Sequence, residues 1–419
     1  MKNKTILLVL ILIFVIIIYG CSGDKEKNET PDTIKIGATG PLSGPSANSG
    51  IALKNGMEMA IEEWNDEGGI EINESEVPIE LIHEDNQAEP SEAVSTAEKL
   101  IDQDDVDFLI GDTFGSSQTM AVMDLAEQYE IPIMSGEPVS SAISEKIEED
   151  IDQYKYFWKG NFSSEGYGES AYETINTIID DGDFEPKDKK IAYIVEDTDY
   201  GHSNVAEAQK LFEEDDWEEI AFETVDLDYT DFYSQLTKLK DLDPDVLITV
   251  FTSVSSGVSL VKQFDEIDLD AMHYAIYYPL RPEFYEQAKE NSEGLIWEPL
   301  SYDPELIEEQ QEFDNDYEEL FDEKGDSDAA QGYDYMNNVL TAISEAGSTD
   351  ADEIVEQMES LSNDGVIGHY EFDENNHTIK YGPDYVPVPS AQVQEDETNE
   401  IIWPENTSTE KYKTQPWLK

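Results

Sequence analysis

The stretch TIKIGATGPLSG, residues 33–44, begins as a β-strand and ends as a segment that cannot be one. Apolar residues alternate with polar or small ones from Ile34 to Ala38, a pattern typical of a strand, and the Gly, Pro and Ser residues at 40–45 indicate a tight loop. Apolar residues then recur at near-helical spacing over residues 50–69. Because ligands settle where such a strand meets such a helix, we expect this loop to form one wall of a binding site.

The same strand, loop and helix unit recurs along the chain. Expected strands and helices alternate over residues 77–135, and a second alternating series runs over residues 166–278. Apolar strands joined by helices are typical of a parallel sheet that is covered on both faces. We therefore predict an α/β protein with two similar halves, followed by three helices between residues 304 and 361.

The composition limits where the protein works and what it binds. Its 419 residues exceed what one hydrophobic core usually serves, so we expect two domains. Lys and Arg number 24 against 97 Asp and Glu, a formal net charge of -73, which excludes nucleic acid and anionic lipid as partners. The acidity is spread along the whole chain, which indicates a surface adapted to high salt, where the screening length falls to roughly 3 Å.

The first 21 residues have the architecture of an export signal. Two lysines precede an apolar stretch from Ile6 to Ile18, and Cys21, the only cysteine, follows after a glycine. The stretch is shorter than the roughly 20 residues of a membrane-spanning helix, and its end resembles a lipobox, in which Cys21 would be lipidated. Tyr19 departs from that pattern, so an uncleaved signal anchor stays open. In either case we expect an exported, membrane-anchored protein, with residues 22–32 as a polar linker.

Seven segments, of which the first overlaps the opening stretch, occur in this order along the chain: IKIGATGPLSGP, HEDNQAEPSEAVSTAEKLI, VDFLIGDTFGSSQT, IPIMSGEP, DTDYGHS, PDVLITV and SEGLIWEP. Their order and spacing resemble those of type I periplasmic binding proteins, and most of all the branched-chain amino acid (Leu/Ile/Val) binding proteins of ABC importers. The resemblance covers most of residues 33–385. It implies two Rossmann-like lobes with parallel central sheets, joined by three hinge crossovers near Phe157, Pro299 and Ile367. The expected lobes comprise residues 33–157 with 300–366, and residues 158–299 with 367–419.

The resemblance also implies a function. Proteins of this family close two lobes over a small ligand and present it to a membrane permease, without carrying out a reaction on it. We expect an amino acid or amino-acid-like ligand, an ABC permease as partner, a monomer, and neither enzyme activity nor cofactor. A ligand-binding sensor of the same fold is the alternative. In agreement, the five histidines show no metal-ligand spacing, and none of the common catalytic motifs occurs.

The candidate ligand contacts of the first half are Phe114, Ser116, Ser117, Glu137, Pro138 and Ser140. Ser116 and Ser117 begin a predicted helix and could bind a ligand carboxylate or only cap that helix. Glu137 could meet a ligand ammonium or decorate an acidic surface, whereas relatives carry small residues and a Thr in this loop. Phe114 and Ala88 occupy the positions of a disulfide in close relatives, so that covalent clasp is absent.

The candidates of the second half and the first crossover are Trp158, Tyr200, Tyr277 and Tyr278. Tyr200 matches a family Tyr that contacts the ligand, with a purely structural Tyr as the alternative. Tyr277 and Tyr278 stand where relatives hold the ammonium with an acidic residue, and could stack on an apolar or cationic group. Arg281, the only arginine, could grip a carboxylate, but we expect a surface ion pair. Trp158 could line the cleft or pack the hinge, and these departures weaken a prediction of Leu/Ile/Val specificity.

Overall fold

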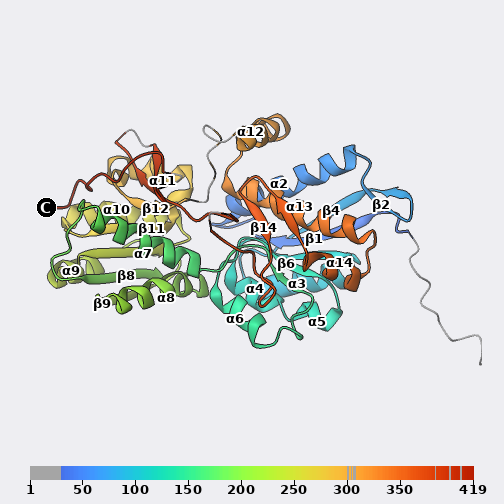
Figure 1. Ribbon diagram of the computed structural model, residues 1–419, viewed down its shortest axis with the longest axis horizontal. Coiled ribbons are helices and arrows are strands. Elements are labelled where there is room, and N and C mark those ends of the chain that lie inside the picture. The colour runs from blue at the N-terminus through green and yellow to red at the C-terminus, as the bar shows by residue number, and fades with distance from the viewer. Residues whose placement is uncertain are drawn as a thin grey trace, which may run out of the picture.

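The computed structural model describes residues 30–299, 302, 304, 308–382, 384–395, 398–405 and 408–419. The predicted export signal, Cys21 and most of the predicted linker lie outside these residues. Figure 1 shows two lobes side by side along the long axis of the molecule, with the C-terminus at the far end of the second lobe. Within the described residues, no helix is both long enough and apolar enough to cross a bilayer.

Each lobe contains one central sheet. The strands of the first sheet are β1 (Ile34–Gly40), β4 (Ile79–Asp85), β5 (Phe108–Asp112), β6 (Ile133–Ser135) and β7 (Phe157–Lys159). Those of the second are β8 (Lys190–Glu196), β9 (Glu218–Val225), β10 (Val246–Phe251), β11 (Met272–Tyr277), β12 (Ile296–Glu298), β15 (Ser390–Val393) and β16 (Asn399–Trp403). Two small ribbons pair β2 (Ile70–Ile72) with β3 (Ser75–Val77), and β13 (Ser362–Asp364) with β14 (His369–Glu371).

Helices cover both sheets. The first lobe carries α2 (Ala47–Asp66), α3 (Pro90–Asp102), α4 (Ser116–Val122), α5 (Leu125–Tyr129), α6 (Ser141–Glu149), α12 (Glu308–Phe321), α13 (Ser327–Ala346) and α14 (Ala351–Met358). The second carries α7 (Glu165–Asp180), α8 (Asp199–Glu214), α9 (Tyr233–Leu242), α10 (Val254–Ile267), α11 (Pro282–Ala288) and the short 3₁₀ helices η1 (Tyr278–Leu280) and η2 (Lys289–Ser292).

The two sheets share one strand order. The first runs β4-β1-β5-β6-β7 and is parallel throughout. In the second, β9-β8-β10-β11-β12 are parallel, and β15 and β16 extend this sheet as antiparallel strands. Counted along the chain, each parallel set has the doubly wound order 2-1-3-4-5. The predicted pair of Rossmann-like lobes is therefore confirmed.

The opening strand behaves as its sequence predicts. β1 lies inside the first sheet, and its apolar residues Ile34, Ile36 and Ala38 are fully buried. The strand stops at Gly40, and α2 begins at residue 47. Between them the loop is fastened to the end of β4, because the backbone N–H of Leu42 (2.8 Å) and the hydroxyl of residue 43 (2.6 Å) both donate to the carboxylate of residue 85.

Two glycines let distant parts of the chain build the first lobe. Helix α13 packs along α2, and a Cβ atom at Gly332 would lie 2.1 Å from the carbonyl oxygen of Leu53. A Cβ atom at Gly56 would likewise lie 1.9 Å from the carbonyl oxygen of Ala329. The helix axes can approach this closely only because both positions lack a side chain.

The chain passes between the sheets three times: between β7 and β8, between β12 and α12, and between β14 and β15. The backbone N–H of Lys159 donates to the carbonyl of His377 (2.8 Å), and that of Ile379 donates to the carbonyl of Lys159 (3.1 Å). Residues 367–379 therefore lie with the first lobe, as does Trp158 in β7. The boundaries predicted after residues 157 and 366 stay predictions; β7 runs to Lys159, and β14 begins at His369.

Candidate ligand-binding site

A cavity of about 290 Å³ lies between the lobes, where parallel strands of both sheets end. The first lobe lines it with Ser46, Ala88, Glu89, Pro90, Phe114, Gly115, Ser116, Ser117, Gln118, Glu137, Val139, Asn161 and Gln331. The second lobe lines it with Tyr167, Glu196, Thr198, Tyr200, Leu227, Thr252 and Tyr277. Its volume is at the lower end of the roughly 300–1,000 Å³ range of small-molecule sites, so it suits a small solute.

The loop after β5 is shaped by a buried carboxylate. The side chain of Asp112 accepts hydrogen bonds from the backbone N–H of Phe114 (3.1 Å) and from the side-chain amide of Asn86 (2.7 Å). Burial raises the pKa of Asp112 to about 7. The hydroxyl oxygen of Ser116 accepts a bond from the backbone N–H of Ser140 (3.3 Å), which ties this loop to the one after β6. Ser116 thus lines the cavity and also holds together the two loops that form this part of its wall.

Glu137 is a buried carboxyl group of the cavity wall. Its side chain is 7% exposed, and Oε1 accepts a hydrogen bond from the side-chain amide of Gln331 (3.0 Å). Oε2 has no hydrogen-bond partner among the described residues. Burial raises the pKa of Glu137 to about 8, although the positive charge of Arg281 opposes that shift. The alternative that Glu137 decorates the surface is wrong.

Aromatic rings from both lobes meet in the cavity. The ring of Tyr277 lies edge-on to that of Phe114, with centroids 6.4 Å apart, and edge-on to that of Tyr200, with centroids 5.9 Å apart. The Tyr200 hydroxyl is buried and has no hydrogen-bond partner within the described chain. Tyr277 has a φ of +78°, a strained backbone conformation of the kind that clusters at ligand sites.

A second carboxylate of the wall, Glu196, has a supporting role. It accepts hydrogen bonds from the backbone N–H (2.7 Å) and hydroxyl (2.8 Å) of Thr252 and from the hydroxyl of Thr198 (2.9 Å). It therefore joins the loops after β8 and β10. Thr198 also accepts a bond from the backbone N–H of Gly201 (3.0 Å), which caps α8 beside Tyr200.

Polar contacts close the cavity between the lobes. Ser117 of α4 donates to Asp199 of α8 (2.9 Å), and Asn48 of α2 donates to Glu283 of α11 (3.3 Å). These four side chains come from opposite lobes, so the structure holds the closed arrangement in which a ligand would be enclosed.

Arg281 adds a buried connection between the lobes. It lies at the start of α11, is 8% exposed, and pairs with Asp326 and Asp328 at the start of α13. It also donates to the hydroxyl of Ser49 in α2. The predicted ion pair exists, but its predicted place on the surface is wrong: the guanidinium crosses the gap between the lobes and is removed from water.

Two predicted contacts lie outside the cavity. Trp158 is 1% exposed and stacks on His377, with ring centroids 4.1 Å apart, so it packs the hinge. Tyr278 is fully buried in the second lobe, where its hydroxyl bonds that of Thr249 (2.9 Å). Tyr278 begins η1 directly after the end of β11, and of this pair only Tyr277 lines the cavity.

Pro138 and Ser140 are also buried and do not line the cavity. In their place the structure brings in Tyr167, Asn161 and Gln331, none of which the sequence singled out. Asn161 follows β7, a position that the strand-end rule could have indicated. Tyr167 and Gln331 lie within helices, and only the packing of the two lobes brings them to the cavity.

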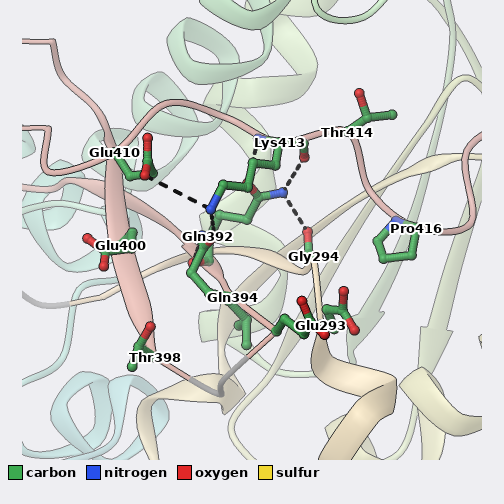
Figure 2. A pocket seen from close by; sticks show the side chains of 12 residues that line it. Glu293, Gly294, Gln392, Gln394, Thr398, Glu400, Glu410, Lys413, Thr414 and Pro416 are labelled. Carbon is green, nitrogen blue, oxygen red and sulfur yellow. Dashed lines mark hydrogen bonds and ion pairs between the residues drawn. The ribbon is translucent and has the colours of Figure 1, made fainter.

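A second hollow, of about 550 Å³, lies at the outer edge of the second lobe. Figure 2 shows that the side chain of Gln392 there points between Gly294 and Lys413, and its amide donates to their carbonyl oxygens (3.1 and 2.7 Å). The Lys413 ammonium in turn donates to Gln394 (2.6 Å). None of the predicted contacts lines this hollow, and its central polar groups bind one another.

Comparisons with known proteins agree with this geometry. A leucine-, isoleucine-, valine-, threonine- and alanine-binding protein of Pseudomonas aeruginosa is 24% identical over 359 residues, which span 84% of this chain and 89% of that protein. The substrate-binding protein LivJ of Streptococcus pneumoniae, solved in complex with isoleucine, is 22% identical with a TM-score of 0.72, covering 89% of this chain and all of that one (100%).

A third similar protein binds a different kind of ligand. An ABC transporter solute-binding protein of Rhodopseudomonas palustris BisB5, solved in complex with 3,4-dihydroxybenzoic acid, is 21% identical with a TM-score of 0.72, covering 87% of this chain and 94% of that one. At such identities the two solved structures show a shared fold alone. The family model for periplasmic binding proteins matches residues 33–388. The chain therefore belongs to the periplasmic binding protein family, whose members bind solutes for transport and are not enzymes.

Proposed function

We propose that this protein captures a small amino-acid-like solute between its lobes and delivers it to the permease of an ABC importer. A lipid on Cys21 attaches the protein to the outer face of the cell membrane. The observation that carries the proposal is the cavity between the lobes at the strand ends, which is lined by rings and by polar groups with unused hydrogen-bonding capacity. A site of this kind suits binding without chemistry, since a solute can be enclosed by lobe closure and released by opening.

Ligand binding is tested with the full chain at molar salt by thermal unfolding against amino acids, betaines and short-chain carboxylates. A ligand at 100 times its Kd stabilises the folded state by about 2.7 kcal/mol, so a true ligand raises the melting temperature in a concentration-dependent way. We expect a solute of this panel to do so with one site per chain. Failure of every small solute would contradict the proposal.

The anchor and the transport role need separate tests. Metabolic labelling with a fatty acid should mark the wild-type protein, and Cys21→Ser should lose both the label and the membrane association. Deleting the gene should abolish uptake of the identified ligand by cells. If uptake continues and only a cellular response to the ligand disappears, the protein is a sensor and the transport role is wrong.

A further inference from the structure

The charged groups beside the cavity are out of balance. The buried guanidinium of Arg281 is already paired with Asp326 and with Asp328, which is fully buried. Glu137 lies close enough for Arg281 to influence its ionisation, yet no ion pair joins the two. Three carboxyl groups, those of Asp326, Asp328 and Glu137, thus surround the guanidinium of Arg281. Glu137 is the carboxyl group of these three that has no ion pair with it.

Glu137 is also the member that faces the cavity. Oε1 is occupied by Gln331, whereas Oε2 is buried and without a partner among the described residues. Among the described residues that line the cavity, none is Lys or Arg. A buried carboxylate without a partner is costly, so Glu137 keeps its proton in the absence of a cation, and a cation that enters the cavity beside Oε2 would stabilise the charged form.

The neighbouring rings suit the same kind of group. Phe114, Tyr200 and Tyr277 stand together in the cavity, and the electron-rich faces and hydroxyl oxygens of such rings attract cations. An ammonium group beside a carboxylate and aromatic rings is stabilised by both. A simple carboxylate would instead bring a negative charge into a cavity whose described lining includes no Lys or Arg.

We propose that Glu137 is the counter-ion of a cationic nitrogen on the ligand, so that the substrates are small ammonium compounds, primary or quaternary, and acids that lack such a nitrogen are rejected. This inference rests on the proposed function and adds the ligand class and the residue that selects it. It also reverses the expected pose. The acidic residue that the resemblance places after β11 is replaced by Tyr277, and the first lobe supplies the carboxyl group from the opposite wall.

Two pairs of ligands test the inference on the full wild-type chain by isothermal titration calorimetry at molar salt. Leucine is compared with 4-methylpentanoate, which has the same skeleton without the amine. Glycine betaine is compared with 3,3-dimethylbutanoate, in which carbon replaces the quaternary nitrogen. We expect the nitrogen compound of at least one pair to bind about 30-fold or more tightly than its partner. The pair that discriminates identifies a primary or a quaternary ammonium ligand.

The variant Glu137→Gln keeps the shape and can still accept the bond from Gln331, but it cannot ionise to a carboxylate when a cation binds. It should weaken the affinity for the preferred nitrogen compound by about 30-fold or more and leave the affinity for the carbon analogue of that compound unchanged. The matched control is Glu145→Gln in α6, which replaces an exposed carboxylate of the same lobe outside the cavity. This variant should leave both affinities unchanged.

The outcomes separate this inference from the proposed function. Equal affinity within both pairs, or tight binding only of acids without nitrogen, would overturn the role of Glu137 and leave solute binding intact. Unchanged affinity of Glu137→Gln for the preferred compound would do the same. If no small solute of any class binds the wild-type chain, both proposals fail. The comparison of ligand pairs needs no variant, so it decides the matter even if Glu137→Gln does not fold.

Discussion

The substitution Arg281→Met should open the lobes. Arg281 comes from the second lobe, and its partners Asp326, Asp328 and Ser49 belong to the first. In the closed arrangement the guanidinium is 8% exposed and Asp328 is fully buried. Removing the cation leaves a buried carboxylate alone. Separation of the lobes would return that group to water, so the cost falls mainly on the closed state.

The size of the effect follows from the burial. Breaking a buried ion pair by removing one partner costs about 3–5 kcal/mol, which corresponds to a loss of roughly 10²- to 10⁴-fold in ligand affinity if the closed state bears all of it. The control is Lys210→Met in α8, which removes the same charge from a side chain that is 60% exposed and paired with Glu207. Exposed pairs contribute about 0–1 kcal/mol, so the control should lose no more than about fivefold.

Calorimetry gives the affinities, and small-angle X-ray scattering gives the radius of gyration with and without ligand. Arg281→Met should show a larger radius than the wild type in the absence of ligand. Adding Asp328→Asn should recover part of the affinity, because it removes the orphaned charge. Wild-type affinity together with a wild-type radius in Arg281→Met would refute the assignment of this ion pair as an interlobe contact that stabilises closure.

Three further predictions concern stability and are checked by denaturant or thermal unfolding of the ligand-free protein. Gly332→Ala should lower the free energy of unfolding by roughly 1–3 kcal/mol, since its methyl group would lie 2.1 Å from the Leu53 carbonyl oxygen. An unchanged free energy of unfolding would mean that α2 and α13 can move apart without loss of stability. Burial raises the pKa of Glu137 from 4.5 to about 8, so between these values the folded state holds a proton that the unfolded state has lost. Stability should therefore fall as pH rises through this window, and Glu137→Gln should reduce that slope; an equal slope in both proteins would contradict the burial of an ionisable group there. The other charged and titratable groups that act on Glu137 are Arg281, Asp326, Asp112, Tyr167, Tyr277 and Tyr335. Finally, the net charge of -73 predicts a melting temperature that rises between 0.1 and about 1 M NaCl, as the screening length falls from roughly 10 to 3 Å, and a flat response would argue against self-repulsion.

Local patterns in the sequence predicted the parts of the fold that depend on local physics. The alternation around Ile36 and the stop at Gly40 mark a buried strand and its end, and both are found in β1. Repetition of this unit predicted two doubly wound lobes. The strand-end rule and the resemblance to periplasmic binding proteins together indicated Phe114, Ser116, Ser117, Glu137, Tyr200 and Tyr277, all of which line the cavity.

The remaining features depend on how distant segments meet. The excess of carboxylates made an ion pair at Arg281 a natural expectation, but nothing local shows that its partners lie on the other lobe. Tyr277 and Tyr278 are the same residue type side by side, and only the backbone turn from β11 into η1 decides which of them reaches the cavity. Gln331 lies in α13, which the chain forms in the first lobe after it has left β12 of the second, so no pattern around it indicates a binding residue.

The most direct test is a crystal structure of the chain grown with the tightest nitrogen compound from the calorimetric comparison. We predict a single molecule enclosed between the lobes, with its cationic nitrogen next to Glu137 Oε2 and beside the rings of Phe114 and Tyr277. A molecule bound instead in the outer hollow around Gln392, or held in the interlobe cavity with its nitrogen turned away from Glu137, would contradict the account.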